Sequence, residues 1–313
     1  METVIDATRL LPGAIATRIL CDAGYNIIKL EDTEKGDYMD ELSTGASNFL
    51  NHGKKSISIN MKMEEGRNIF YKIIKNASVF IENFKAGITE RLGINYEKLI
   101  VINPELVYCS IKGYRSDPEL PGHDNNFTAL SGIDHVLPVQ IADTGSGMYA
   151  AFEIVDHLKN KDYSKITVYM SDIPLLFNSF SLFAENNTLN GEFPNYRIYN
   201  TENGKIALGC VEQKFWDNFL MAIKRPDLST GRLDPKINST IENMLLCYKS
   251  EQIIEMGRKY CFPVSRIRNR NEIIHELNFG ESPKHGENTF EILKNNGYSK
   301  IEIENFKKNK AIK

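Results

Sequence analysis

The sequence of 313 residues lacks an excess of basic charge, an even number of cysteines and a long apolar run. Its formal net charge of -3 argues against a nucleic-acid partner, because binding a phosphate backbone needs a broad excess of Lys and Arg. The five cysteines are scattered and mostly lie in apolar stretches, so we expect reduced residues of a cytoplasmic protein and no metal site. Charged residues near the N-terminus, with no uninterrupted apolar segment, predict neither a signal peptide nor a membrane span.

The composition, 42% hydrophobic and 25% charged, is that of an ordinary globular protein with one large or two smaller domains. Strand-like and helical patterns alternate through residues 1–190, which predicts a doubly wound, Rossmann-like α/β domain. Within it, the polar stretch 32–48 is expected to form a long surface loop. A hairpin with an Asn203-Gly204 turn follows and predicts a small α+β domain at 191–270. Residues 271–313 are expected to form a linker and a C-terminal segment that returns to the large domain.

The stretch 121–147 contains a histidine and an aspartate, each at a predicted break in regular structure. Pro121-Gly122 is followed by apolar residues at helical spacing, so His123 is expected at a helix entrance. Asp143 ends an apolar run and precedes a glycine-rich stretch, which predicts a strand, a turn and then a helix. Free backbone N–H groups in such a turn favour a nearby negative charge.

A neutral imidazole and a carboxylate that face one carbon atom can remove a proton from one side and return a proton to the other. His123 and Asp143 are candidates for this chemistry. A lone His-Asp pair is more often a surface turn or a helix cap, so the catalytic interpretation depends on other parts of the chain.

Several segments resemble the family III CoA-transferases and, within that family, the α-methylacyl-CoA racemases. The resemblance covers Val4 to Glu31 with its Arg-Leu-Leu-Pro-Gly turn, 51–60, 79–93 (VFIENFKAGITERLG), 102–132, 141–147 and the tail HGENTFEILKNNGYSKIEIENF. It implies a CoA-binding large domain and an interlocked homodimer, in which each chain forms a ring threaded by its partner.

The resemblance also implies roles for three residues. Gly122-His123-Asp124 matches the racemase form of the family's Gly-His-Asp motif. Asp143 matches a carboxylate that transfers protons in racemases and accepts the acyl group in transferases. Glu212 matches a glutamate that orients the histidine.

Four basic residues match positions at which the family binds the phosphates of CoA: Lys54, Lys55, Lys85 and Arg91. Lysines on loops are more often simply solvated, and that alternative stays open. The family's Arg-Pro-Gly is here Lys85-Ala86-Gly87, which keeps the positive charge but loses the bidentate guanidinium.

The leading hypothesis is a racemase or epimerase of 2-methylacyl-CoA thioesters, an isomerase of lipid metabolism that transfers protons at the α carbon. His123 and Asp143 exchange acid and base roles, and backbone N–H groups at Gly145 to Gly147 stabilise the enolate oxygen. One alternative is CoA transfer between carboxylic acids through an aspartyl intermediate. Another is a non-catalytic acyl-CoA-binding homologue, because the segments between His123 and Asp143 and between Ile267 and His285 are short for the family. CoA enters as part of the substrate, and no separate cofactor is expected.

Overall fold

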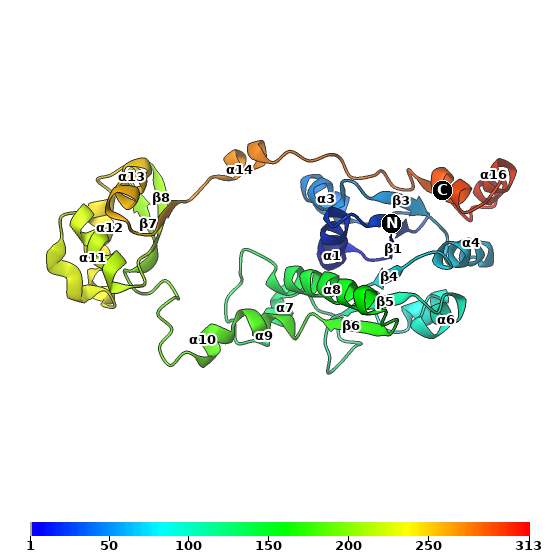
Figure 1. Cartoon of the computed structure of the whole chain (residues 1–313), viewed down its shortest axis with the longest axis horizontal. Helices are drawn as coiled ribbons and strands as arrows, with labels where there is room; N and C mark the ends of the chain where they lie inside the picture. Colours follow the sequence, from blue (N-terminus) through cyan, green and yellow to red (C-terminus); the bar gives the residue numbers. More distant parts are fainter. Residues whose placement is uncertain (1) are drawn as a thin grey trace. The chain divides into compact units, whose positions relative to one another are not determined.

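The computed structural model describes residues 2–313, which form two compact units (Figure 1). Unit 1 comprises the chain up to Ser179 together with Phe279–Lys313, and unit 2 comprises Phe180–Asn278. Unit 2 therefore begins earlier and ends later than the predicted small domain at 191–270, and the C-terminal segment is part of unit 1.

Unit 1 is built on a six-stranded sheet with the order β3-β2-β1-β4-β5-β6. All its strands are parallel: β1 (Thr3–Asp6), β2 (Asn26–Glu31), β3 (Lys55–Ser58), β4 (Val79–Glu82), β5 (Val107–Lys112) and β6 (Lys165–Tyr169). The strands are short, largely apolar runs buried on both faces, as parallel strands covered by helices must be. The predicted doubly wound fold is confirmed. The strand order reverses between β1 and β4, which is where such sheets bind ligands.

Helices cover both faces of this sheet. Helices α1 (Leu10–Asp22) and α8 (Ile141–Asn160) pack on one face around Leu20 and Ile154. The other face is covered around Phe70, Leu99 and Leu293 by α4 (Glu64–Ile74), α6 (Tyr96–Ile102), α15 (Thr289–Asn295) and α16 (Lys300–Lys308). Further short helices of unit 1 include α5 (Ile88–Leu92), α7 (Asp124–Ala129) and α9 (Ile173–Phe177). No helix within 2–313 is long and apolar enough to cross a membrane.

The prediction of a long surface loop at 32–48 is wrong. This segment contains α2 (Met39–Leu42) and the start of α3 (Thr44–Asn51). The Ser43 hydroxyl caps α3 by accepting a hydrogen bond from the Ala46 N–H at 3.2 Å. Met39 and Leu50 anchor the two short helices in a small apolar cluster, and so few apolar positions leave a weak periodic signal.

The C-terminal segment protects the β3 edge of the sheet. Asn288 Oδ1 accepts a hydrogen bond from the Ser56 N–H at 2.9 Å, and Thr289 Oγ1 accepts one from the Ser58 N–H at 3.1 Å. The Asn288 N–H in turn donates to the Ser56 carbonyl at 2.9 Å. These contacts satisfy backbone groups that an open sheet edge would leave unpaired.

Unit 2 combines a three-stranded antiparallel sheet with helices packed on it, as the α+β prediction requires. The strands are β7 (Tyr196–Thr201), β8 (Gly204–Gly209) and β9 (Val264–Arg266), and the predicted hairpin is the β7–β8 pair. Trp216 and Phe219 are fully buried at the centre of its core. The helices are α10 (Ser179–Phe183, at the boundary of the units), α11 (Gln213–Ala222), α12 (Asn238–Leu245), α13 (Ser250–Tyr260) and α14 (Arg270–Glu276), with 3-10 turns at Pro226–Gly231 and Pro235–Ile237.

Candidate active site

His123 stands immediately before α7, at the helix entrance that the sequence predicts. Its backbone N–H donates to Asn126 Oδ1 at 3.0 Å, and its carbonyl accepts from the Asn126 N–H at 2.8 Å. The preceding Gly122 has no room for a side chain, because a Cβ atom there would lie 2.8 Å from the rings of both Tyr114 and Phe127. This close packing fixes the backbone before α7, and His123 itself is exposed.

Asp143 lies in the first turn of α8, so the predicted strand and glycine-rich turn are wrong. Gly145 and Gly147 are inside the helix, where they permit close packing. A Cβ atom on Gly147 would lie 2.4 Å from the Pro12 carbonyl oxygen, and one on Gly145 would lie 2.5 Å from the Ile173 side chain. Their N–H groups donate within the helix, as interior α-helical residues do. The predicted enolate stabilisation by backbone N–H groups at Gly145 to Gly147 therefore has no basis in this fold.

The Asp124 carboxylate joins the start of α7 to the start of α8. Its Oδ1 accepts hydrogen bonds from the backbone N–H groups of Ala142 and Asp143, at 2.7 and 3.0 Å. A carboxylate at a helix N-terminus satisfies free donors and interacts favourably with the helix dipole. The sequence analysis predicts no separate role for Asp124. Its place in the Gly-His-Asp motif is the only sequence feature that points to it.

Asp143 carries a perturbed carboxyl group. Burial is the main cause that raises its pKa to about 6, the negative charge of Asp124 adds to the rise, and His123 acts in the opposite direction. The hydrogen bonds from the Ala142 and Asp143 N–H groups to Asp124 hold the start of α7, where His123 stands, against the start of α8. A carboxyl group whose pKa lies near neutral pH is suited both to proton transfer and to nucleophilic attack as the anion.

Lys54, one of the predicted phosphate ligands, lies in the interior of unit 1. Its side chain is fully buried, and Nζ donates to Thr17 Oγ1 and Asn51 Oδ1 at 2.7 Å each and to the Ala14 carbonyl at 3.2 Å. The Asp6 carboxylate lies 3.8 Å from the same nitrogen. All three protons of the ammonium group are used inside the fold.

The other three predicted phosphate ligands lie at or near the surface of unit 1. Lys55 Nζ pairs with Glu291 Oε1 at 2.5 Å, so a phosphate must compete with this carboxylate. Lys85, in the loop that follows β4, and Arg91, in α5, are both exposed. Their positions beyond the end of β4 agree with the ligand-binding edge of a doubly wound sheet.

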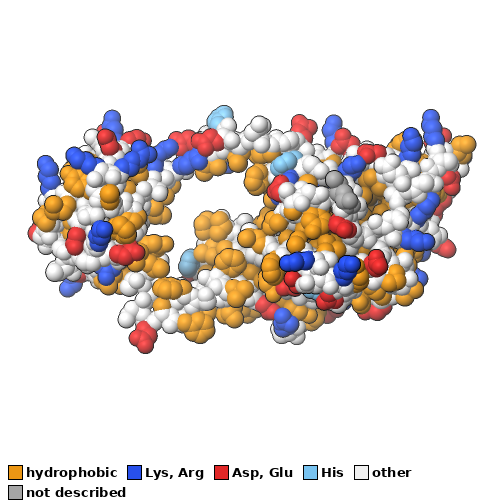
Figure 2. All heavy atoms as spheres, in the orientation of Figure 1, with side chains coloured by type: hydrophobic (Ala, Val, Ile, Leu, Met, Phe, Trp, Pro, Cys, Tyr) orange, Lys and Arg blue, Asp and Glu red, His pale blue; other side chains and the backbone are white. Residues whose placement is uncertain are grey.

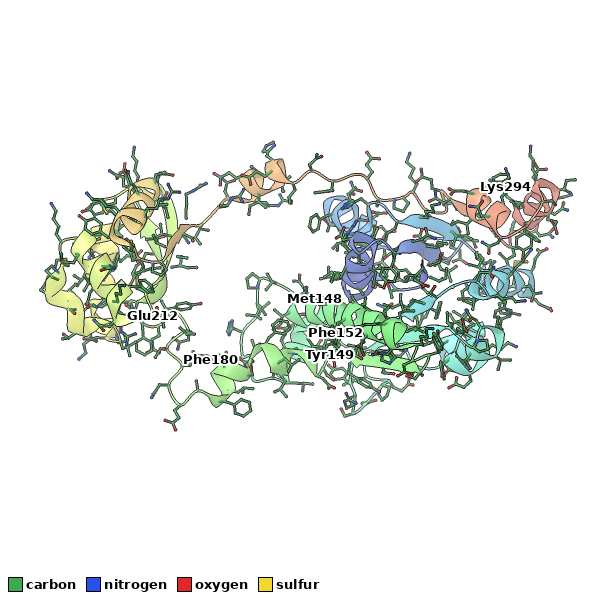
Figure 3. All side chains as sticks on the ribbon, viewed as in Figure 1. Met148, Tyr149, Phe152, Phe180, Glu212 and Lys294 are labelled. Carbon is green, nitrogen blue, oxygen red and sulfur yellow. The ribbon has the colours of Figure 1, made fainter. Side chains whose placement is uncertain are left out.

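Glu212 belongs to unit 2, where it is the residue before α11 and is exposed. Its carbonyl accepts the N–H groups of Phe215 and Trp216 at 3.1 Å each, which leaves the carboxylate outside the helix (Figure 3). His123 and Asp143 belong to unit 1. The orienting role of Glu212 stays a prediction.

The profile of CoA-transferase family III matches residues 2–283. The chain belongs to CoA-transferase family III. A CaiB/BaiF family protein from Brucella suis has a crystal structure with the same fold: the TM-score is 0.80 at 19% identity, over 94% of this chain and 98% of that one.

Among curated proteins, an acetyl-CoA:oxalate CoA-transferase from Acetobacter aceti is 41% identical over 140 residues, which are 42% of this chain and 36% of that enzyme. A succinyl-CoA:mesaconate CoA-transferase from Haloarcula marismortui is 26% identical over 283 residues, 77% of this chain and 70% of that enzyme. The match thus spans about a third of the length of the first relative and 70% of the length of the second. Both relatives are named as CoA-transferases.

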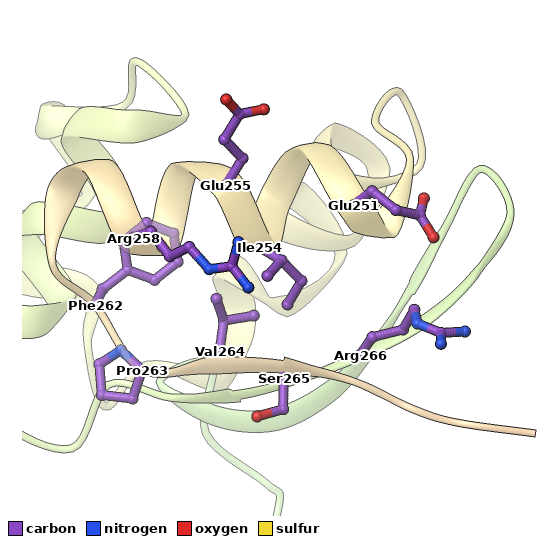
Figure 4. A pocket seen from close by; sticks show the side chains of 10 residues that line it. Glu251, Ile254, Glu255, Arg258, Phe262, Pro263, Val264, Ser265 and Arg266 are labelled. Atoms are coloured by element: carbon purple, nitrogen blue, oxygen red, sulfur yellow. The ribbon is translucent and has the colours of Figure 1, made fainter. Parts of the chain in front are cut away.

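A groove of about 780 Å³ lies in unit 2 between α13 and β9 (Figure 4). Ile254 and Val264 line it together with the charged side chains of Glu251, Arg258 and Arg266. None of the predicted site residues of this family III chain lines the groove. The candidate active site is therefore the cluster of His123, Asp124 and Asp143 and not this groove.

Proposed function

We propose that this chain transfers CoA between carboxylic acids, with Asp143 as the nucleophile. The observation that carries the proposal is the Asp143 carboxyl group in the first turn of α8, beside Asp124 and with a pKa raised to about 6. At neutral pH this carboxyl group is largely ionised, and a carboxylate with a raised pKa is more basic than an ordinary surface aspartate. The CoA-transferase names of the relatives support the same choice.

In this mechanism the Asp143 carboxylate attacks the thioester carbonyl carbon of the donor, which forms a mixed anhydride and releases CoA thiolate. The thiolate then attacks the aspartyl carbonyl carbon, so that the donor acid leaves and CoA becomes a thioester of Asp143. The acceptor carboxylate attacks the carbonyl carbon of this thioester, which forms a second anhydride and releases CoA thiolate again. Attack of CoA thiolate on the acceptor's carbonyl carbon yields the new acyl-CoA and restores Asp143.

CoA binding is assigned to the edge of the sheet where β1 and β4 end. Lys85 and Arg91 lie at the surface beyond β4 and supply positive charge for the phosphates. Lys55 begins β3, at the edge of the same sheet, and is paired with Glu291.

Racemisation at the α carbon is the second candidate, and the accessible His123 beside Asp143 favours it. An imidazole and a carboxyl group in one cluster can hold two proton-transfer positions, one on each side of a planar enolate. The reaction needs no acceptor acid, and the α hydrogen exchanges with solvent during turnover.

One incubation separates the two reactions. The protein is given a 2-methylacyl-CoA in heavy water together with an isotopically labelled acceptor acid. CoA transfer predicts labelled acyl-CoA and an undeuterated α carbon. Deuterium at the α carbon in the absence of any acceptor contradicts the transferase proposal and supports racemisation, while Asp143→Asn is the inactive control for both reactions.

We also propose that a second copy of the chain covers an apolar surface of unit 1. On α8, Met148, Tyr149 and Phe152 are 52%, 43% and 65% exposed (Figure 3). Hydrophobic side chains are visible on the surface in this region (Figure 2), and Leu175, Leu176 and Phe177 of α9 extend the exposed apolar set. Large exposed apolar surfaces mark interaction sites. Sedimentation equilibrium is expected to give a homodimer that Phe152→Ser weakens, whereas a folded monomer at micromolar concentration contradicts the assignment.

A further inference from the structure

A charged pair with a buried carboxylate and a partly buried lysine lies at the end of β4, outside the cluster of His123, Asp124 and Asp143. The Glu82 side chain is 1% exposed, and its two carboxylate oxygens lie 3.0 and 3.2 Å from Nζ of Lys112 on β5, the neighbouring strand (Figure 1). The Ser110 hydroxyl donates to the same carboxylate. A buried ion pair is weak evidence for stability alone, because the loss of hydration offsets most of the attraction. The hydrogen bonds that the pair makes to the neighbouring loop indicate its role more clearly than its stability does.

This pair holds the backbone of the loop that follows β4. The Phe84 N–H donates to Glu82 Oε2 at 2.7 Å, and the Phe84 carbonyl accepts from Lys112 Nζ at 2.7 Å. The ion pair therefore binds both backbone polar groups of Phe84: Glu82 binds the N–H and Lys112 binds the carbonyl.

Asn83, the residue before Phe84, is bound on the β1 side of β4. Its Oδ1 accepts from the Arg9 N–H at 2.9 Å, and its Nδ2 donates to the Arg9 carbonyl at 2.7 Å. Arg9 follows β1, so residues 82–84 are tied to β1 on one side and to β5 on the other. These contacts fix the loop at the point where the strand order reverses. The next residue, Lys85, reaches the surface.

We infer that Glu82 and Lys112 are positioning residues, which hold the β4–α5 loop so that Lys85 is presented to a phosphate of CoA. This inference rests on the proposed binding of CoA substrates. A loop that is ordered before the ligand arrives does not lose its freedom on binding, and this preorganisation strengthens the affinity. Neither Glu82 nor Lys112 needs to touch the ligand.

The test uses the full-length protein and coenzyme A itself, with the dissociation constant measured by calorimetry. Removing one partner alone leaves a buried unpaired group, so the informative variant is the neutral double substitution Glu82→Gln/Lys112→Met. We expect it to weaken CoA binding about tenfold, a loss that preorganisation of one loop can supply. Hydrogen exchange is expected to show faster exchange of the Phe84 amide. The matched control is Glu34→Gln/Lys62→Met, which neutralises an exposed pair elsewhere on unit 1 and should bind as the wild type does.

Coupling to Lys85 distinguishes positioning from general loss of structure. In a Lys85→Ala background the double substitution should cause no further loss of affinity, because the group it positions is absent. Equal losses with and without Lys85, or an unchanged dissociation constant in the double variant, overturn the inference while the proposed function stands. Absence of CoA binding by the wild type contradicts the proposed function, and the inference then falls with it.

Discussion

Replacing Asp124 by asparagine separates its charge from its hydrogen bonds. The asparagine side chain keeps an Oδ1 acceptor for the N–H groups of Ala142 and Asp143, so the start of α8 stays capped. The negative charge beside Asp143 is lost. Burial is the larger cause of the raised pKa of Asp143, and the Asp124 charge is the second. We therefore expect the pKa of Asp143 to fall from about 6 by roughly one unit, and not to the ordinary value of an exposed aspartate.

The assay is the pH dependence of kcat/KM for CoA transfer. The nucleophile is the ionised carboxylate, so activity falls as pH drops through the pKa of Asp143, and Asp124→Asn should move this acid limb to lower pH by roughly one unit. The comparison variant Asp124→Ala also loses the cap, which costs about 1 kcal/mol of stability. An acid limb that stays at the wild-type pH in Asp124→Asn refutes the electrostatic account of this cluster.

Three further predictions concern single side chains. Burial lowers the pKa of Lys54 to about 7, below that of a lysine in the unfolded chain, so the unfolded state binds more protons above pH 7. Urea unfolding should therefore show a free energy of unfolding that rises by about 2 kcal/mol between roughly pH 7 and 9. The rise should vanish in Lys54→Met, and an equal rise in that variant contradicts the burial of the charge as its cause. Gly147→Ala places a Cβ atom against the Pro12 carbonyl and should cost about 1–3 kcal/mol in thermal unfolding, whereas Gly45→Ala on α3 meets no atom within 4 Å and should be neutral or stabilising. His123→Ala should leave CoA transfer largely intact, and a loss of transfer on the scale of about 10²-fold or more would show that the imidazole takes part in it.

The sheet of unit 1 could be predicted from the sequence because its strands carry a strong local signal. Short, largely apolar strands such as Val79–Glu82 alternate with amphipathic helices, and that alternation is sufficient to indicate a doubly wound fold. The resemblance to the family rests on the same local segments.

The environments of individual site residues depend on distant parts of the chain and could not be predicted. Lys54 follows a His-Gly turn and looks like a solvated loop lysine, but Asp6 and Thr17, far away in sequence, draw its ammonium group into the interior. Gly145 and Gly147 give a local turn signal. In the structure both glycines are helical and allow α1 and α9 to pack closely against α8. These contacts come from distant parts of the chain, so the local sequence does not reveal them.

If Asp143 is the nucleophile, an oxygen atom of the acceptor acid enters its side chain during turnover. The protein turns over acyl-CoA with an acceptor acid labelled with oxygen-18 in both carboxylate positions, and the peptide containing Asp143 is then analysed by mass spectrometry. In the proposed sequence the acceptor attacks the aspartyl thioester, and one of its oxygens remains on Asp143 when the new acyl-CoA departs. Heavy oxygen is expected at Asp143 and at no other aspartate. Turnover that moves CoA to the acceptor and leaves Asp143 unlabelled contradicts it.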